Sequence, residues 1–162
     1  MLIRLYEKSD WPQLLAILQA TFERGDTYAY APGSTEAEIQ SAWITSPETT
    51  FVACSDSGQL LGSYVLKPNQ PGLGSHVCNC GYVVSELAQG QGVATALCAH
   101  SQVEAVRRGY KAMQFNLVVS TNVRAVTLWS RLGFRTVGVL PQAFRHRELG
   151  LVDALVMFKA LV

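Results

Sequence analysis

The residues best suited to bind a charged ligand form a short glycine-rich run, QGQGVAT at residues 89–95. The run follows an apolar stretch, residues 81–84, and leads directly into a helical pattern. Small residues at such a junction let the main chain approach a ligand closely, because no Cβ stands in the way. A helix that starts there points unpaired N–H groups and the positive end of its dipole at the space before it. The run therefore predicts a phosphate-binding turn.

Two common phosphate motifs do not fit the run. A dinucleotide fingerprint needs Gly or Ala at position 95, where this chain has Thr95, and an acidic residue about 20 positions further on. Residues 111–115 offer no acid, and the chain lacks the Gly-Lys-Ser/Thr of a P-loop. In the plainer interpretation, the run is a helix start with small side chains and no ligand.

A second segment with possible function is NVRAVTLWSRLGF at residues 122–134. Asn122 can cap a helix, and the apolar residues that follow repeat on one helical face. Gly133 suits the left-handed position after a helix. Taken alone, the segment is an ordinary amphipathic helix, and Asn122 is a cap rather than a ligand-binding residue.

Together the two segments resemble the signatures of the GNAT acyl-CoA N-acyltransferases. Gln89, Gly92 and Ala94 match the first signature, Gln/Arg-x-x-Gly-x-Gly/Ala. Residues 122–134 match the second, Asn-x-x-Ala-x-x-Leu-aromatic-x-x-x-Gly-Phe. The resemblance is specific over residues 76–140 and follows the rest of the chain in outline. It implies an N-acyltransferase that uses acetyl-CoA as acyl-donor co-substrate and needs no metal.

Length and composition fit one domain. The chain of 162 residues is long enough for one well-packed core and too short for two, so residues 1–162 are expected to form a single domain. No apolar stretch approaches the ~20 residues that cross a membrane, and the N-terminus lacks the pattern of a signal peptide. The net charge of +1 gives no basic field for nucleic acid. We therefore expect a cytoplasmic protein that binds neither nucleic acid nor membrane.

The four cysteines are expected to be buried, reduced thiols. Cys78 and Cys80 point to the same face of a predicted strand, but zinc sites place two to four residues between paired ligands. The other two, Cys54 and Cys98, are isolated in the sequence.

Hydrophobic periodicity and turn signals predict the element order βααβββαβαββ. Strands are expected at residues 1–7, 51–54, 60–66, 76–84, 114–119, 135–140 and 152–161, and helices at 10–24, 35–44, 95–108 and 122–132. This order is an α+β domain with about four helices around a mixed sheet. In the GNAT fold, which it resembles, the strand that ends at Val84 and the strand 115–119 splay apart, and pantetheine enters the gap.

The resemblance implies that this strand, the glycine-rich turn and Asn122 bind the donor. The main chains of Val83 and Val84 would pair with pantetheine, the N–H groups of residues 90–95 would bind pyrophosphate, and Gln89 would close the turn. The expected donor-binding residues are Tyr82, Val83, Val84, Gln89, Gly90, Gln91, Gly92, Val93, Ala94, Thr95 and Asn122.

Asn79 and Asn116 interrupt apolar strands, where a buried amide without partners costs about 1–3 kcal/mol. In one interpretation, each amide satisfies a bulge or a loop end. In the other, the stretches around both residues and residues 152–159 resemble the fungal N-acetyltransferases of proline analogues such as azetidine-2-carboxylate. In those enzymes the matching positions hold a substrate carboxylate. Tyr28 and Leu117 complete the acceptor-binding residues that this resemblance implies.

The chemistry needs an acceptor for the amine proton, donors for an oxyanion and a proton for the leaving thiolate. Many GNAT enzymes take that last proton from a tyrosine in the second signature. This chain has Trp129 there, whose N–H is too weak an acid. Asn122 is the expected replacement, as a hydrogen-bond donor that does not titrate. Glu86 is the candidate base, and a water chain or residues 26–30 are the alternatives.

The sequence therefore predicts an enzyme that acetylates the amine of a small molecule, an amino or imino acid, by direct attack in a ternary complex. Peptide or protein N-acetylation is one alternative, and it would favour an open, acidic acceptor groove. A non-catalytic acyl-CoA-binding module is the other, and Trp129 is its best support. We also expect a homodimer.

Overall fold

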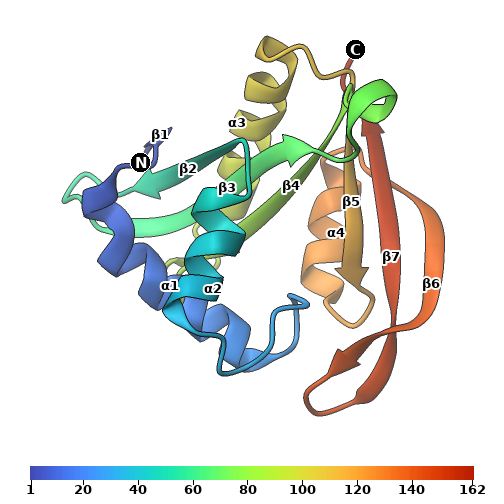
Figure 1. The fold of residues 1–162 in the computed structure, drawn as a ribbon, viewed down its shortest axis with the longest axis horizontal. Helices are drawn as coiled ribbons and strands as arrows, with labels where there is room; N and C mark the ends of the chain where they lie inside the picture. The colour runs from blue at the N-terminus through green and yellow to red at the C-terminus, as the bar shows by residue number, and fades with distance from the viewer.

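The elements follow the order expected from the sequence. The structure, a computed structural model, describes residues 1–162. The strands are β1 (Leu2–Leu5), β2 (Thr49–Cys54), β3 (Leu60–Pro68), β4 (Val77–Val84), β5 (Ala112–Val119), β6 (Arg135–His146) and β7 (Gly150–Ala160). The α-helices are α1 (Trp11–Arg24), α2 (Glu36–Gln40), α3 (Val93–Arg107) and α4 (Val123–Arg131). The predicted α+β fold is confirmed, with a seven-stranded mixed sheet and four α-helices (Figure 1).

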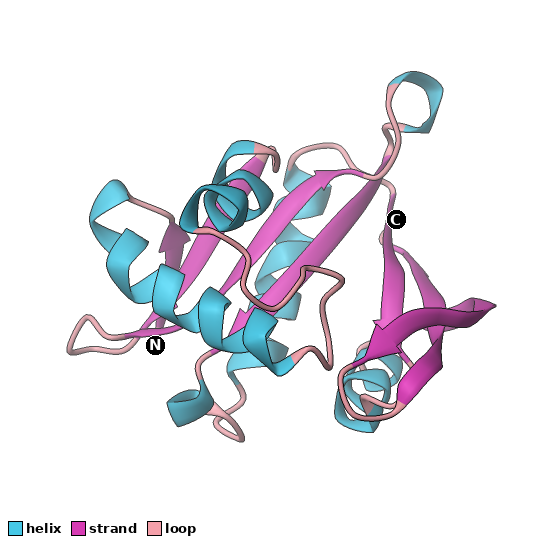
Figure 2. Cartoon of the chain, turned by 60° about the horizontal axis from the view of Figure 1, so that its bottom comes forward, coloured by secondary structure: helices cyan, strands magenta, loops and turns pink.

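The sheet divides between β4 and β5. Its strand order is β1-β2-β3-β4-β5-β7-β6, in which β4 and β5 are the parallel neighbours. These two strands pair only where residues 77–79 lie beside residues 112–114. Beyond that point β5, β6 and β7 turn away from β2, β3 and β4 (Figure 2). The predicted splay is thereby confirmed, and the two strands separate toward the C-terminal end of β4.

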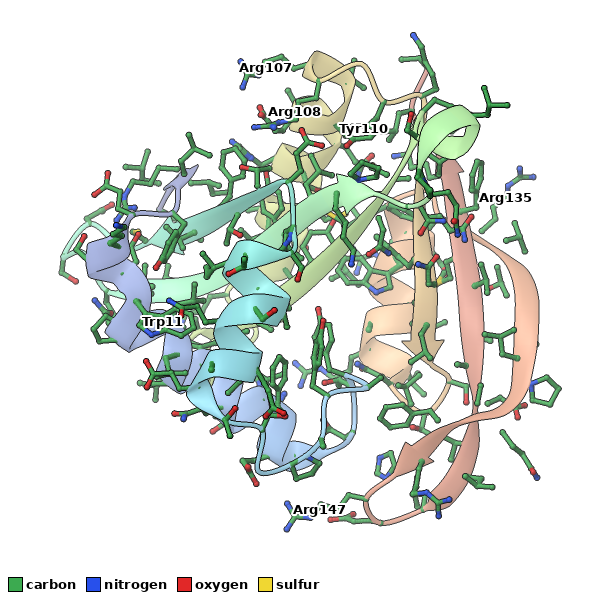
Figure 3. All side chains as sticks on the ribbon, viewed as in Figure 1. Trp11, Arg107, Arg108, Tyr110, Arg135 and Arg147 are labelled. Carbon is green, nitrogen blue, oxygen red and sulfur yellow. The ribbon has the colours of Figure 1, made fainter.

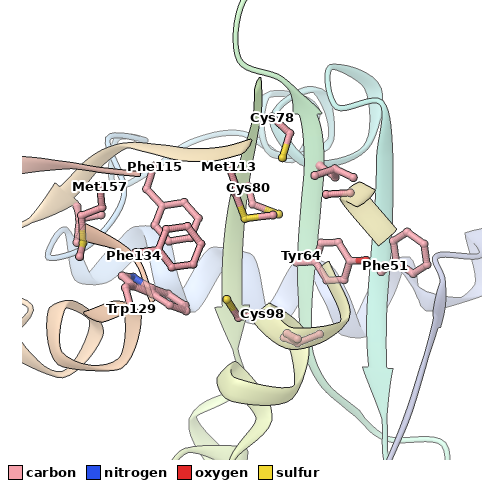
Figure 4. Close-up of a cluster of buried hydrophobic side chains, with 14 of the residues drawn as sticks. Phe51, Tyr64, Cys78, Cys80, Cys98, Met113, Phe115, Trp129, Phe134 and Met157 are labelled. Carbon is pink, nitrogen blue, oxygen red and sulfur yellow. The ribbon is translucent and has the colours of Figure 1, made fainter. Parts of the chain in front are cut away.

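Two apolar layers pack on the faces of the sheet. Side chains alternate between faces along a strand, so Cys78 and Cys80 of β4 lie in the layer beneath α3, and Val83 lies in the layer beneath α1. The layer on the α3 and α4 side contains Tyr64, Cys98, Met113, Phe115, Trp129 and Phe134 (Figure 4). The opposite layer contains Leu14, Leu18, Phe22, Ile39, Trp43 and Val65. Packing on both faces fixes β3 and β4 as a rigid wall beside the splay.

Local signals place most helix ends correctly. α1 ends at Gly25, which has a left-handed φ of 61°. Thr35 and Glu38 form a capping box at the start of α2, a signal that is readable in the sequence. The helical run then continues through a π turn, Ser41–Thr45, that buries Trp43.

One expected element end is wrong, and one helix begins without a side-chain cap. Asp10 precedes α1 but does not cap it, because its carboxylate binds the Arg4 guanidinium at oxygen–nitrogen distances of 2.7 and 2.8 Å. β6 extends to His146 rather than to residue 140. Register shifts between Thr136 and Gly138 and between residues 140 and 144 allow its pairing with β7 to continue past these irregularities.

All four cysteines are free and buried, as predicted. Burial raises the pKa of Cys78 to about 12, so this thiol stays protonated at neutral pH. None of the helices combines the length and the apolar character needed to cross a bilayer.

Candidate active site

The space between the splayed strands belongs to one large cleft. The cleft has a volume of 1280 Å³ and is lined by β4, β5, the turn after β4, the start of α4 and the loop after α1. It brings together Tyr28, Asn79, Gly90 and Asn122, which are distant in sequence. Every site residue expected from the sequence lines this cleft except Gln91.

The glycine-rich turn presents an uncapped helix start to the cleft. α3 begins after Gly92, which is left-handed with a φ of 78°, and no side chain caps the helix. A Cβ at Gly90 or Gly92 would meet no atom within 4 Å, so the space beside both glycines is open. The first N–H groups of an α-helix have no acceptor within the helix. The turn therefore fits a phosphate-bearing ligand such as coenzyme A.

Two details of this turn differ from expectation. Gln91 rather than Gln89 closes it, because the Gln91 side-chain nitrogen donates to the Leu87 carbonyl oxygen at 2.9 Å. The Gln91 main-chain N–H donates to the Ala88 carbonyl oxygen at 3.4 Å, so it is engaged within the turn. Gln89 is exposed and lines the cleft.

The main chain of β4 alternates between β3 and the gap. The Val77 carbonyl oxygen accepts a hydrogen bond at 2.8 Å from Asn69, immediately after β3, so the odd-numbered residues of β4 face β3. Val83 therefore directs its N–H and C=O toward β3, contrary to expectation. Tyr82 and Val84 direct theirs toward the gap. The expected pairing of a ligand with the Val83 main chain is corrected to Tyr82 and Val84.

Tyr28 holds the edge of β4 beside the gap. Its hydroxyl donates to the Tyr82 carbonyl oxygen at 2.8 Å, and its ring packs edge-on against Trp43 with centroids 5.6 Å apart. Burial raises the pKa of Tyr28 well above its ordinary value, so the hydroxyl remains a donor at neutral pH. A Cβ at Gly81 would lie 3.0 Å from this hydroxyl, which explains the glycine there.

Asn79 marks the point where β4 and β5 separate. Its side-chain nitrogen donates to the Gln114 carbonyl oxygen at 2.9 Å, at the last paired position of the two strands. The amide thus satisfies a main-chain oxygen that the sheet leaves unpaired. This contact agrees with the structural interpretation that the sequence left open.

Asn116 is exposed on β5, so it is not the buried amide that the apolar sequence around it suggested. Its side-chain nitrogen donates to the Asn69 side-chain oxygen at 2.7 Å, and its own oxygen accepts from the Gln114 side chain at 2.9 Å. Leu117, the next residue, is partly buried and lines the cleft. The amide of Asn116 is therefore engaged at both ends within the protein.

Asn122 is the N-cap of α4 and also lines the cleft. Its side-chain oxygen accepts the Ala125 N–H at 3.2 Å, while its side-chain nitrogen makes no hydrogen bond within the protein. Trp129 is 9 % exposed and packs against Tyr82 and Phe115, with ring centroids 5.0 and 5.2 Å away. Trp129 therefore belongs to the apolar layer. Asn122 retains a free side-chain N–H group that can donate a hydrogen bond into the cleft.

Three charged side chains of the cleft form one group. Arg24 lies 3.2 Å from a Glu86 oxygen and 3.4 Å from an Asp26 oxygen. The Glu86 side chain is 64 % exposed, whereas the Asp26 Oδ1 that faces Arg24 is buried and makes no hydrogen bond beyond this ion pair. The Thr27 hydroxyl is buried and has no partner at all. A buried polar atom without a partner is costly, so this hydroxyl suits a polar group of a ligand.

Two further residues of the cleft, Lys67 and His146, were not among the expected site residues. His146 lies near the tip of the β6–β7 hairpin. The neighbouring Arg147 explains its position: its N–H donates to the Gly25 carbonyl oxygen at 3.0 Å, and its guanidinium donates to that of Glu23 at 2.6 Å. Figure 3 shows Arg147 at this tip. The hairpin is therefore tied to the loop after α1.

Comparison with known proteins identifies the family. The model of the acetyltransferase (GNAT) family matches residues 11–134. A GCN5-related N-acetyltransferase from Kribbella flavida is 41% identical, with a TM-score of 0.93 over 98% of this chain and 96% of that chain. The N-acetyltransferase aca1 of Schizosaccharomyces pombe is 35% identical over 117 residues, 72% of this chain.

The match with aca1 spans 56% of the length of that protein. The protein yncA of Salmonella typhimurium, solved with its cofactor acetyl-CoA, is 20% identical, with a TM-score of 0.86 over 100% of this chain and 94% of that chain. At this identity, yncA shows a shared fold alone. The family model, by contrast, covers most of the chain. The chain belongs to the GNAT family of acetyltransferases.

Proposed function

We propose that the protein transfers an acetyl group from acetyl-CoA to the amine of a small molecule, an amino or imino acid, by direct attack in a ternary complex. The observation that carries this proposal is the single cleft, in which an uncapped helix start, the gap-facing edge of β4 and an aromatic loop share one space. The first two suit a long donor with phosphate and amide groups, and the loop suits a small acceptor. Direct transfer requires that both be held side by side.

The donor would lie along the gap. The N–H groups of residues 92–95 fit its pyrophosphate, and the gap-facing main chain of Tyr82 and Val84 fits the amides of its pantetheine arm. Bound acetyl-CoA would supply the thioester acyl group. The fold shared with the acetyl-CoA-bound yncA protein supports this placement.

The reaction needs hydrogen-bond donors for developing negative charge and an acceptor for the amine proton. The chain offers different groups for each. The free side-chain nitrogen of Asn122 and the gap-facing N–H groups of β4 are donors for an oxyanion and a leaving thiolate. Glu86 and Asp26 border the same cleft and are the candidate acceptors of the amine proton. Arg24 contacts both carboxylates and would hold them in position.

Two observations favour a small acceptor over a peptide. Tyr28, Tyr30 and Trp43 form an aromatic cluster at the loop after α1, and all three line the cleft. The carboxylates of the cleft pair with Arg24, so they do not form the open acidic groove that would suit a basic peptide. The aromatic surface suits a small apolar ring, and the resemblance to the fungal enzymes of proline analogues supports a cyclic imino acid.

We place the enzyme in the cytoplasm and propose that it forms a homodimer. Four free, buried cysteines suit a reducing compartment. The edge strand β6 exposes Val137 and Val139, an apolar stripe that a second copy would cover.

A thiol-release assay with acetyl-CoA and a panel of amines tests the proposed function. The panel holds free amino acids, azetidine-2-carboxylate, proline, polyamines and short peptides. We expect saturable thiol release, an N-acetylated product and the highest kcat/KM with small amino or imino acids. A preference for peptides would favour protein acetylation, and thiol release with none of the amines would favour a non-catalytic module.

A further inference from the structure

The cleft contains a partly buried cation with no ionic partner. Its lining includes four basic side chains, Arg24, Lys67, Arg124 and Arg131, and the two carboxylates of Asp26 and Glu86. Both carboxylates pair with Arg24. The other three cations form no ion pair, and of these Arg124 and Arg131 are exposed on α4, whereas Lys67 is partly buried on β3. The stem of Lys67 is thus partly covered while its ammonium has no ionic partner, and a bound anion would supply that partner.

The sheet register places Lys67 on the acceptor side of the cleft. Lys67 lies directly opposite Asn79 across the β3–β4 pair, so the two side chains share a face. That face carries Val65 and Val83, which belong to the apolar layer beneath α1. Gly81, two residues beyond Asn79, lies beneath the Tyr28 hydroxyl. A strand rises about 3.4 Å per residue. Along the strand direction, the main chain of Lys67 therefore lies roughly 7 Å from Gly81, the residue that the Tyr28 hydroxyl covers.

The neutral amides nearby are engaged by the protein. Asn79 donates to the Gln114 carbonyl oxygen, and Asn116 is bonded at both ends to neighbouring amides. Their arrangement is a fixed support for the splay rather than a set of free donors. An anion that enters this part of the cleft therefore meets Lys67 as its available charged donor.

We infer that Lys67 binds an anionic group, a carboxylate, that the acceptor carries next to its amine, and that this contact sets a preference for amino or imino acids over neutral amines and polyamines. The inference rests on the proposed function, because it names the residue that selects the acceptor. The unbonded hydroxyl of Thr27, next to the Asp26 carboxylate, is the complementary site for the amine N–H groups. Lys67 is a specificity residue, and the chemistry of transfer does not pass through it.

The test compares two acceptors with the same amine, the best carboxylate substrate and its carboxamide. Lys67→Met should raise KM for the acid by about 10- to 100-fold, the loss typical of one hydrogen bond to a charged group, and should leave KM for the carboxamide and for acetyl-CoA unchanged. Lys67→Arg should retain most of the preference for the acid. Lys111→Met, at an exposed lysine outside the cleft, is the matched control and should behave as wild type. An unchanged acid-to-amide preference in Lys67→Met would overturn the inference.

The outcomes for Lys67 and for the proposed function are distinguishable. If the wild-type enzyme acetylates amines but prefers carboxamides or polyamines, acetyl transfer stands and the role of Lys67 is wrong. If wild type releases no thiol with any amine, the proposed function fails. Calorimetry of the CoA-loaded protein with azetidine-2-carboxylate and its carboxamide then decides on Lys67 alone. Binding of the acid to wild type and its loss in Lys67→Met would support the inference, and any other pattern would overturn it.

Discussion

At the scale of single residues, Asn122 has two contacts that substitution can separate. Its side-chain oxygen caps α4, and its side-chain nitrogen is free beside the cleft. Asn122→Ala should lower kcat by about 10²–10³-fold, as when one oxyanion donor is removed, and should cost about 1 kcal/mol of unfolding free energy. Asn122→Ser keeps a good cap and removes the amide nitrogen, so it should lose kcat with little loss of stability. Kinetics and denaturant unfolding measure both effects; a normal kcat in the Ser variant would leave capping as the only role.

Local motifs predicted residues that the structure brings to one cleft, but the orientations of single residues required the fold. The glycine-rich turn and Asn122 line one cleft because each is defined within a few neighbouring residues. The direction of the Val83 main chain depends on the pairing of β4 with β3. The amide of Asn79 pairs with Gln114, which a sequence pattern cannot anticipate. Strand alternation from Val65 could have placed Lys67 on the acceptor face.

At the scale of elements, the start of α3 should bind the pyrophosphate of acetyl-CoA through its N–H groups. Gly92→Glu places a carboxylate where phosphate is expected and should raise Kd for acetyl-CoA by at least about 100-fold, since juxtaposed like charges cost several kcal/mol. Gly92→Gln is the matched control, with the same shape and the same strain at a φ of +78°. Calorimetry compares the two. Equal affinities would place the pyrophosphate elsewhere.

The C-terminal turn of α3 should make the free energy of unfolding decrease at acidic pH. Glu104 is held by Arg107 at 2.8 Å and by Arg108 at 2.6 Å, near the end of the helix where both arginines lie (Figure 3). These contacts lower the pKa of Glu104 from 4.5 to about 2. The folded pKa is below the unfolded one, so the stabilisation is complete above pH 4.5 and is lost as the pH falls toward about 2.

Glu104→Gln should therefore lower the unfolding free energy by about 2 kcal/mol at pH 7, the scale of hydrogen bonds to charged groups. The difference from wild type should shrink between pH 4.5 and about 2. Denaturant unfolding of both proteins across this range measures it. A difference that does not change with pH would show that the contribution of Glu104 is not ionic.

The order of elements was predictable because each long element carries its own periodicity and end signals. Gly25 and the Thr35 capping box are examples of signals that act within one turn. The extension of β6 to His146 was missed, because it is sustained by pairing with β7 through two register shifts. The exact vertex of the splay is likewise set by where β4 and β5 stop pairing, which is a tertiary property.

At the scale of the whole molecule, the exposed stripe on β6 should be the dimer contact. Val139 is 54 % exposed on this edge strand, and a twofold interface would use it twice. Val139→Lys should raise the dimer Kd by on the order of 100-fold, since two apolar contacts of about 1.5 kcal/mol each are lost. Val103→Lys, on the exposed side of α3, is the control and should leave assembly unchanged. Sedimentation velocity measures both; a monomeric wild type would contradict the proposal.

The contact between Arg147 and the loop after α1 bears on how such enzymes diversify. The part of the chain that matches the family model ends at residue 134, before the β6–β7 hairpin begins. The tip of that hairpin nevertheless holds the carbonyl oxygens of Glu23 and Gly25, and His146 lines the cleft. The glycine-rich turn thus lies within the part that the family model matches, while the hairpin that braces the loop after α1 follows it in the chain. If the cleft binds both substrates as we propose, exchange of the hairpin between relatives should alter acceptor choice while leaving the proposed coenzyme site intact.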